Sequence, residues 1–275
     1  MLYITCAQFK GEIMSSLSLS LKGALQQPVV LLQGLVLPVI LLALWQYNSG
    51  LGSSHAYAFV PLQNIYSASL QLLETGELWV NTWGSLKKAG LGFLIGSTAG
   101  LILGALLAYS KVFNALVSPL FNSVRQVPLL GLTPLIALWF GNGEEAKIFI
   151  IALASFFPMV INTFQGLSHY DEKYSEVARI YQFSFWREFK RIRLPQALPH
   201  ILTGLNLAVP FTWITTTASE LLFNAGAGLG NLMMKAEINA EMDILLVCAI
   251  TVTMSGIFMT ACLHFISKHL LQWRA

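Results

Sequence analysis

Arg125 is the side chain with the clearest potential for chemistry, because it is the one charge in the otherwise apolar stretch from about residue 116 to residue 140. A charge inside a membrane is costly, and such residues are functional candidates by default. The Arg125 guanidinium could attract an anion. Alternatively, it reaches the membrane interface, or it caps backbone carbonyls around the break that Pro128 introduces.

Other patterns that carry chemistry are missing from the sequence. There is no GxxxxGK(S/T) phosphate loop, and the five histidines form no HExxH or i, i+4 pair. The three cysteines form no CxxC pair, and two of them, Cys248 and Cys262, lie in apolar stretches where cysteine behaves as a small hydrophobic residue. We find no Ser/His/Asp arrangement and no paired intramembrane carboxylates. We therefore expect no catalytic residue, no metal site and no cofactor.

The run from Asp171 to Pro199 is a charged island between two long apolar stretches. It holds six of the sixteen Lys and Arg residues of the chain, namely Lys173, Arg179, Arg187, Lys190, Arg191 and Arg193. Its apolar residues recur at helical spacing, at Val177, Tyr181, Phe185, Phe189 and Ile192. The pattern indicates an amphipathic docking element. Because four acidic residues interrupt the basic face, a groove on a protein suits it better than a lipid surface.

Composition places the chain in a membrane. The charged fraction of 11% is less than half of the roughly 25% found in soluble domains, and the mean hydropathy is +0.64. The net charge of +3 is too small for nucleic-acid binding to be the main function. We expect an all-α integral membrane protein with about six spans, near residues 28–47, 86–109, 116–140, 147–167, 196–219 and 244–266.

Three spans have distinctive features. In the second, Gly92, Gly96, Gly100 and Gly104 line one helical face, which lets another helix approach closely, either within the chain or in a second subunit. The third contains Pro128, Gly131 and Pro134, so an unbroken helix is not expected there. The sixth is expected to begin after Asp243 as its N-cap.

The distribution of Lys and Arg predicts the orientation. With the N-terminus in the cytoplasm, eleven of these residues lie inside and four outside, with Arg125 left aside. The four outside are Lys87, Lys88, Lys147 and Lys235. Both termini and the charged island are therefore expected to face the cytoplasm, with residues 1–27 as a cytoplasmic extension and residues 28–275 as the membrane domain.

The island is expected to form two short helices. The first would start at Asp171, whose carboxylate can cap free N–H groups, and the second at Ser184, with Glu188 near its positive end. Because Leu194 precedes Pro195, it is expected to leave helical geometry and to end the second helix before the fifth span.

This island resembles the cytoplasmic signature of the permease subunits of bacterial ABC importers, approximately E-A-A-x-x-x-G, nine residues, then I-x-L-P. The matching positions are Glu176, Val177, Ala178, Gln182, Ile192, Leu194 and Pro195. The sequence departs at Val177, where Ala is usual, and at Gln182, where Gly is usual. Since Gly permits a turn with positive φ, Gln182 either adopts that turn with strain or the bend is made differently.

The resemblance extends over roughly residues 35 to 275 and is greatest to the subgroup for sulfonate, taurine and nitrate. It includes Gly76 to Trp79, Arg125 to Pro128, Pro134 to Gly141, Leu194 to Ile201, and then Glu220 and Gly228 to Gly230. It implies a permease for a small anion, most like those for aliphatic sulfonates, with taurine, nitrate or a thiamine precursor as alternatives.

The resemblance also implies partners. These are a pair of cytoplasmic ATPase subunits that hydrolyse ATP, an extracytoplasmic solute-binding protein, and a second permease copy in the bacterial inner membrane. The coupling helix pair between spans 4 and 5 would contact the ATPase through Glu176, Val177, Ala178, Arg179, Tyr181, Gln182, Phe185, Arg187, Leu194 and Pro195. Like Arg125, Glu220, Gly228 and Gly230 would belong to the pathway or its gate. Since a carboxylate repels anions, gating suits Glu220 better than binding substrate, and a structural hydrogen-bonding role is the alternative.

Two other classes remain open. A secondary transporter would also be apolar, but it should show repeat symmetry and several intramembrane ionisable residues. A membrane scaffold protein could use the same island to bind lipid or protein, without solute flux or dependence on an ATPase. Co-purification of an ATPase would distinguish the three classes.

Overall fold

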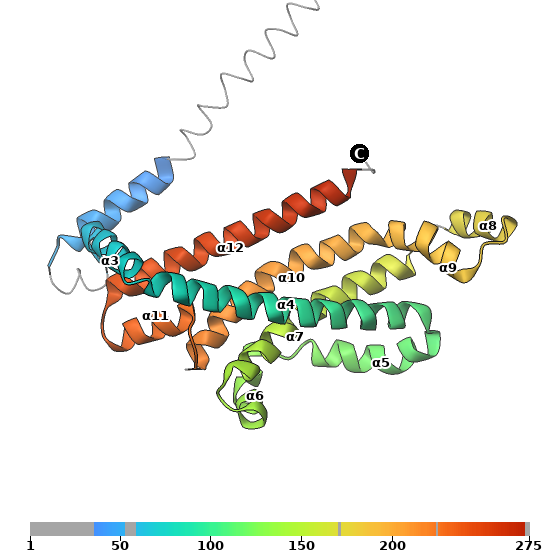
Figure 1. The fold of residues 1–275 in the computed structure, drawn as a ribbon, viewed down its shortest axis with the longest axis horizontal. Helices are drawn as coiled ribbons and strands as arrows, with labels where there is room; N and C mark the ends of the chain where they lie inside the picture. The colour runs from blue at the N-terminus through green and yellow to red at the C-terminus, as the bar shows by residue number, and fades with distance from the viewer. Residues whose placement is uncertain (1–35, 53–58, 170–171, 224, 273–275) are drawn as a thin grey trace, which may run out of the picture. The chain divides into compact units, whose positions relative to one another are not determined.

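The structure is a computed structural model that describes residues 36–52, 59–169, 172–223 and 225–272. All secondary structure in these ranges is helical (Figure 1). The chain divides into two units, residues 1–64 and 65–275. In the first, the described part is mainly the apolar helix Val36–Ser49, where the Trp45 indole donates to the carbonyl of Val60 (2.8 Å).

The second unit contains the following helices, with η2 in π geometry and η1 in 3₁₀ geometry. They are α4 (Glu77–Tyr109), α5 (Lys111–Val124), η1 (Leu129–Leu132), α6 (Thr133–Phe140), α7 (Glu144–Ser168), α8 (Glu172–Ile180), α9 (Phe185–Glu188), η2 (Phe189–Arg193), α10 (Leu194–Leu222), α11 (Leu229–Ile238) and α12 (Met242–Leu270). Helix α3 (Leu62–Glu74) begins just before the division between the units.

Four helical segments of the described chain are long and apolar enough to cross a membrane. These are α4, α7, the continuous run Phe185–Leu222 and α12. The segments Lys111–Val124 and Leu129–Phe140 form a fifth candidate that is bent by 86°. This bend confirms that the third predicted span is not an unbroken helix. The first predicted span, 28–47, lies partly outside the described residues.

The glycines of α4 lie against α7. A Cβ added at Gly100 would lie 2.7 Å from the Phe156 carbonyl oxygen, and one added at Gly104 would lie 2.7 Å from the Val160 carbonyl oxygen. At Gly92 and Gly96 the hypothetical Cβ would be closer still to α7. Backbone packing at this distance maximises van der Waals contact where the hydrophobic effect no longer drives association. The glycine face is therefore used within the chain.

The entry to α10 differs from the prediction. Leu194 is helical, with φ −64° and ψ −46°, and α9, η2 and α10 form one continuous helical segment. The expectation that Leu194 would end the second island helix was wrong. The π turn explains why, because the Leu194 N–H bonds to the carbonyl of Phe189, five residues back. A widened turn gives the Pro195 ring room that the preceding turn of an α-helix would deny it.

Three predicted helix starts can be compared with the structure. Asp243 was expected as the N-cap of the last span, but the N-cap of α12 is Glu241, and Asp243 lies in the first turn. The carboxylate of Asp243 there accepts from the N–H of Ile244 (2.9 Å) and still complements the helix dipole. The predicted cap at Asp171 lies outside the described residues, and α8 begins at Glu172. Ser184 is the N-cap of α9, without a side-chain bond.

Candidate functional site

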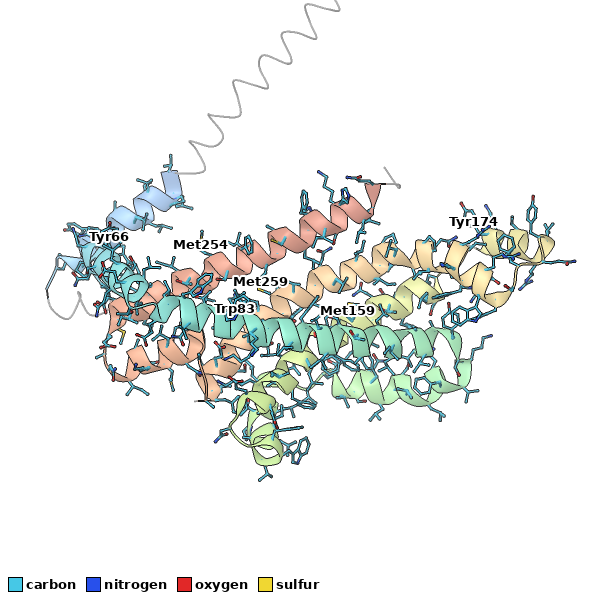
Figure 2. All side chains as sticks on the ribbon, in the orientation of Figure 1. Tyr66, Trp83, Met159, Tyr174, Met254 and Met259 are labelled. Atoms are coloured by element: carbon cyan, nitrogen blue, oxygen red, sulfur yellow. The ribbon has the colours of Figure 1, made fainter. Side chains whose placement is uncertain are left out.

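The segment that we call the docking loop, residues 172–193, exposes large apolar side chains. It lies at the N-terminal end of α10, and α11 follows the other end of that helix (Figure 1). The exposed side chains, among them the Tyr174 labelled in Figure 2, are Tyr174, Val177, Ile180, Tyr181, Phe185 and Trp186. A cluster of exposed apolar groups among charges is typical of a surface that binds another protein.

Charged side chains surround this apolar surface. Glu176, Arg179 and Arg187 are all exposed, as is Gln182. Ala178 differs, because it is 1% exposed and lies beneath the surface. Any contribution of Ala178 to docking must therefore act through the shape of α8. Pro195 is half-buried and Leu194 is 36% exposed at the start of α10.

The turn between α8 and α9 is a Schellman motif with glutamine in place of glycine. The Phe183 N–H bonds to the Ala178 carbonyl (2.9 Å), and the Gln182 N–H bonds to the Arg179 carbonyl (3.0 Å). Gln182 has φ +49°, the left-handed conformation that glycine adopts without strain. Of the two possibilities left open by the sequence, Gln182 adopts the strained turn.

The base of the docking loop is fixed to the end of α4. The Tyr109 ring makes edge contacts with Phe185 and Phe189, at centroid distances of 5.8 and 6.0 Å. The Arg193 guanidinium lies 5.8 Å from the Tyr109 ring centre and forms an ion pair with Glu188 (2.8 Å). The base of the docking loop therefore contacts α4 as well as continuing into α10.

At the other end of α10, a buried ion pair joins it to α4. The Lys88 ammonium lies 2.7 Å from a carboxylate oxygen of Glu220, and the two side chains are 4% and 0% exposed. The Ser85 hydroxyl lies within hydrogen-bond distance of both carboxylate oxygens, at 2.9 and 2.8 Å. A buried charge pair is tolerated only when such additional bonds satisfy it.

The same charges hold the glycine-rich segment 225–230. Lys88 donates to the Ala227 carbonyl (2.6 Å), and the fully buried Lys147 of α7 donates to the Ala225 carbonyl (2.5 Å). The Gly230 N–H, in the first turn of α11, donates to Glu220 (2.9 Å). We call Ser85, Lys88, Lys147, Glu220 and residues 225–230 the ion cluster.

The two predicted glycines of this segment are required by the ion cluster. A Cβ at Gly230 would lie 2.6 Å from the Glu220 Cβ, and a Cβ at Gly228 would meet the Glu220 carboxylate. The structure therefore brings Glu220, Gly228 and Gly230 together, whereas Arg125 lies elsewhere. The Glu220 carboxylate is fully bonded to internal partners, so its visible role is to fix the start of α11 against α4.

Sequence reasoning missed Lys88 and Lys147 as members of a site, because it counted them as external loop charges. The available signal was their position beside apolar helical stretches, since α4 and α7 contain them within long membrane-type helices. Buried lysines at such positions require a partner.

Arg125 borders a groove at the bend between α5 and η1. The groove has a volume of about 670 Å³ and contacts the α7 and α10 helices, with Phe157, Asn162 and Phe211 among its lining residues. Asn162 is mostly buried, and its amide donates to the Pro158 carbonyl (2.8 Å). The site thus offers an exposed guanidinium beside an aromatic and amide-lined hollow, which suits a small anion with an apolar part.

Comparison with known proteins identifies the family. Residues 96–274 match the model of the binding-protein-dependent transport system inner membrane component, and the chain belongs to this family. An aliphatic sulfonates transport permease, SsuC of Bacillus subtilis (strain 168), is 35% identical over 88% of each chain. SsuC of Escherichia coli (strain K12) is 34% identical over 86% of this chain and 90% of its own. The nitrate import permease NrtB of Leptolyngbya laminosa is 30% identical over 67% of this chain and 66% of its own.

Solved structures show the same fold at low sequence identity. The inward-facing MetNI methionine ABC transporter aligns with a TM-score of 0.57 and 17% identity, covering 72% of this chain and 96% of that chain. An amino acid ABC transporter solved with histidines gives a TM-score of 0.57 and 20% identity, and the alignment covers 74% of this chain and 97% of that chain. The predicted all-α membrane fold of ABC importer permeases is confirmed. The protein is a multi-pass membrane transport subunit.

Proposed function

We propose that this permease imports aliphatic sulfonates, that a separate pair of ATPase subunits binds the docking loop, and that a solute-binding protein delivers the substrate on the opposite side. The observation that carries the ATPase part is the continuous helical run from Phe185 to Leu222. It joins an exposed apolar docking loop at one end to the ion cluster at the other. Closure of an ATPase dimer on the loop would then move the buried end of α10 directly.

The orientation follows from the charge distribution. With the docking loop in the cytoplasm, its six basic residues lie on the inner side, as the positive-inside rule favours. Two of the four lysines counted outside, Lys88 and Lys147, are buried in the ion cluster, where Lys88 pairs with Glu220 and Lys147 donates to a backbone carbonyl. We therefore place both termini in the cytoplasm.

Two observations support the sulfonate part of the proposal. The two SsuC relatives named above carry names that assign them to the transport of aliphatic sulfonates. The groove beside Arg125 pairs a guanidinium with aromatic walls, which complements a sulfonate group attached to a short alkyl chain. Nitrate is the second candidate because of the relative NrtB, and taurine and thiamine precursors follow.

Uptake complementation tests the proposal. The permease would be expressed with the ATPase and binding protein of a sulfonate importer in a strain lacking its own, with ethanesulfonate or taurine as sole sulfur source or nitrate as sole nitrogen source. We expect growth on ethanesulfonate that requires all three proteins. Rescue with nitrate but not with ethanesulfonate or taurine would make nitrate the substrate in place of a sulfonate. Growth without the ATPase would reject the ATP-driven mechanism.

A variant pair tests the groove. Arg125→Gln should raise the KM for ethanesulfonate uptake about tenfold or more, because a charge-assisted hydrogen bond contributes roughly 1.5–3 kcal/mol. Lys111→Gln, at the exposed start of α5, is the matched control and should leave the KM unchanged. Equal effects of the two substitutions would remove Arg125 from the pathway.

A further inference from the structure

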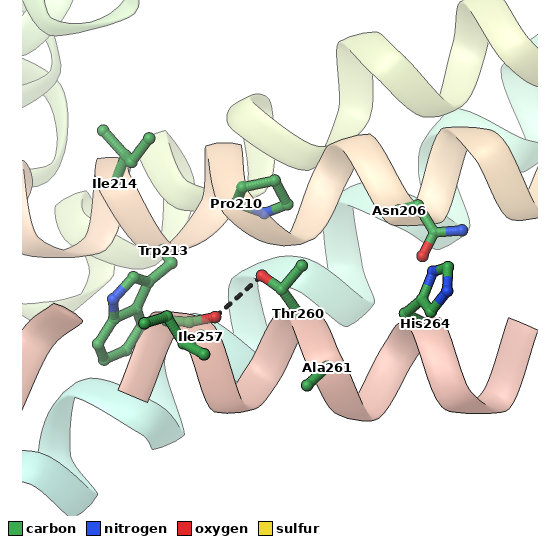
Figure 3. Close-up of a pocket in the computed structure, with 9 residues that line it drawn as sticks. Asn206, Pro210, Trp213, Ile214, Ile257, Thr260, Ala261 and His264 are labelled. Atoms are coloured by element: carbon green, nitrogen blue, oxygen red, sulfur yellow. Dashed lines mark hydrogen bonds between the residues drawn. The ribbon is translucent and has the colours of Figure 1, made fainter. Parts of the chain in front are cut away.

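A second groove lies between α10 and α12 (Figure 3), and no residue of the docking loop or of the ion cluster lines it. Its volume is about 700 Å³. Two hydrogen bonds join the helices near it. The Trp213 indole donates to the Val252 carbonyl (2.9 Å), and the Asn206 amide donates to the Ser267 hydroxyl (3.2 Å). These bonds hold the two helices together on either side of an open space.

The lining of this groove is amphipathic along its length. Its body is apolar, with Pro210, Trp213, Ile214, Ile257 and Ala261 among its residues. Asn206 of α10 and His264 of α12 lie at one end and point toward one another in Figure 3. Thr260 adds little polarity, because its hydroxyl bonds to the Gly256 carbonyl of its own helix (2.9 Å).

The charge at the polar end is positive. Lys268 lies one turn beyond His264 on the same face of α12, and His269 follows it in the last turn. Neither helix carries an acidic residue near this end, because residues 194–219 and 244–272 contain no Asp or Glu. The acidic residues of the two helices, Glu220 and Asp243, lie at the opposite end.

His264 adds a second indication of a ligand. It lies within a membrane-type helix and is exposed, and among the described residues we find no hydrogen bond to its imidazole. Ionisable side chains within membrane-type helices are rare and mark functional sites. An imidazole N–H beside the Asn206 amide can bind the ester or phosphate oxygens of an amphiphile.

We propose that this groove binds an anionic phospholipid, with its phosphate at Lys268 and His264 and one acyl chain along Pro210, Trp213 and Ile257. Basic pockets between membrane helices bind anionic head groups in this way. The length is suitable, since the eight helical steps from Asn206 to Ile214 rise about 12 Å, close to the roughly 15 Å of hydrocarbon in one leaflet. The proposal is independent of the transported substrate.

Native mass spectrometry of the purified full-length protein in detergent tests this site. After delipidation, phosphatidylglycerol or phosphatidylcholine would be added at equal concentrations. We expect one tightly retained phosphatidylglycerol per chain and at least fivefold less phosphatidylcholine. Retention of both lipids to the same extent would overturn the proposal, and so would displacement of phosphatidylglycerol by millimolar inorganic phosphate, which would indicate a site for a free anion.

Two kinds of variant locate the site. Ala261→Phe fills the groove and should abolish retention, whereas Cys262→Phe, at the next position and outside the lining, should not. Lys268→Gln is exposed and leaves packing intact, and it should weaken phosphatidylglycerol binding about fivefold. Equal retention by Ala261→Phe and Cys262→Phe would overturn the proposal. Loss of an oligomer by Ala261→Phe with lipid retained would instead assign the groove to a helix of a second copy.

Discussion

The Lys88 ammonium and a Glu220 carboxylate oxygen lie 2.7 Å apart in the protein interior, and they join two helices that both also contact the docking loop. Helix α4 carries Lys88 and ends at Tyr109, which contacts Phe185 and Phe189. Helix α10 carries Glu220 and begins directly after Arg193. The two helices are thus fastened at both ends, so they should move together when the loop is displaced.

The ion pair should be important for stability. Glu220→Gln leaves Lys88 buried beside Lys147 without a countercharge, and breaking a buried pair in this way costs about 3–5 kcal/mol. Equilibrium unfolding in mixed micelles would measure the loss. Glu77→Gln is the control, because its pair with Lys235 is long (3.6 Å) and exposed. That variant should change stability little. Similar losses in both variants would contradict the assigned role of the cluster.

A double variant separates charge from packing. Lys88→Met together with Glu220→Gln removes both charges, so the double variant should recover part of the stability lost by Glu220→Gln alone. Recovery should be incomplete, since Lys88 also holds the Ala227 carbonyl. An additive loss would mean that Lys88 acts through that carbonyl and not through Glu220.

The close packing of the α4 glycines against α7 can be tested with Gly→Ala substitutions, which each add one methyl group. Gly96→Ala places a Cβ against the backbone of Ala152, which cannot yield easily, so we expect a loss of about 1–3 kcal/mol and a lower yield of folded protein. Gly90→Ala in the same helix is the control, because nothing lies within 4 Å of its Cβ. This substitution should be neutral or slightly stabilising. A tolerant Gly96 would show that α4 and α7 separate readily.

The turn at Gln182 should prefer glycine and reject branched side chains. Gln182→Gly relieves the cost of a positive φ and should leave the loop at least as stable, whereas Gln182→Val should destabilise it by roughly 1–3 kcal/mol. Limited proteolysis of the loop would report both effects. Gln71→Val in α3, where the backbone is helical, should cost no more than about 0.7 kcal/mol. If valine were equally tolerated at both positions, the strained turn would not exist in solution.

Docking should depend on side chains at the surface of the loop. Glu176→Lys should weaken co-purification of the ATPase and uncouple uptake while the spans stay inserted, because it reverses an exposed rim charge. Trp186→Ala should do the same by removing an exposed apolar anchor. Ala178→Trp should instead disturb the loop itself, since this position is buried. Normal uptake by Glu176→Lys and Trp186→Ala would exclude this surface as the docking site.

Much of the fold could be predicted from hydropathy, because apolar stretches long enough to cross a bilayer are rare outside membranes. The predicted spans 86–109, 147–167, 196–219 and 244–266 lie within α4, α7, α10 and α12. The observed helices are longer. Polar residues such as Ser85 extend α4 beyond its apolar core because other helices cover them. A hydropathy profile does not report which polar residues neighbouring helices bury, so it underestimates the length of such a helix.

The ion cluster could be predicted only in part. Glu220, Gly228 and Gly230 were chosen from a family resemblance, but the Ser85 hydroxyl that bonds Glu220 is 135 residues away in sequence. Such a contact leaves no local pattern. The π turn was missed for a related reason, since the rule for residues before proline assumes an α-helical turn, and η2 avoids the conflict by changing its hydrogen bonds.

The π turn also has a mechanical consequence. A π segment holds one residue more per hydrogen-bonded turn than an α-helix, so the bulge can in principle migrate along the chain. A shift of the π turn by one residue would rotate α9 relative to α10 by about 100° and move it about 1.5 Å along the helix axis. The junction between the docking loop and α10 would then convert a small displacement along the helix axis into a rotation of the loop.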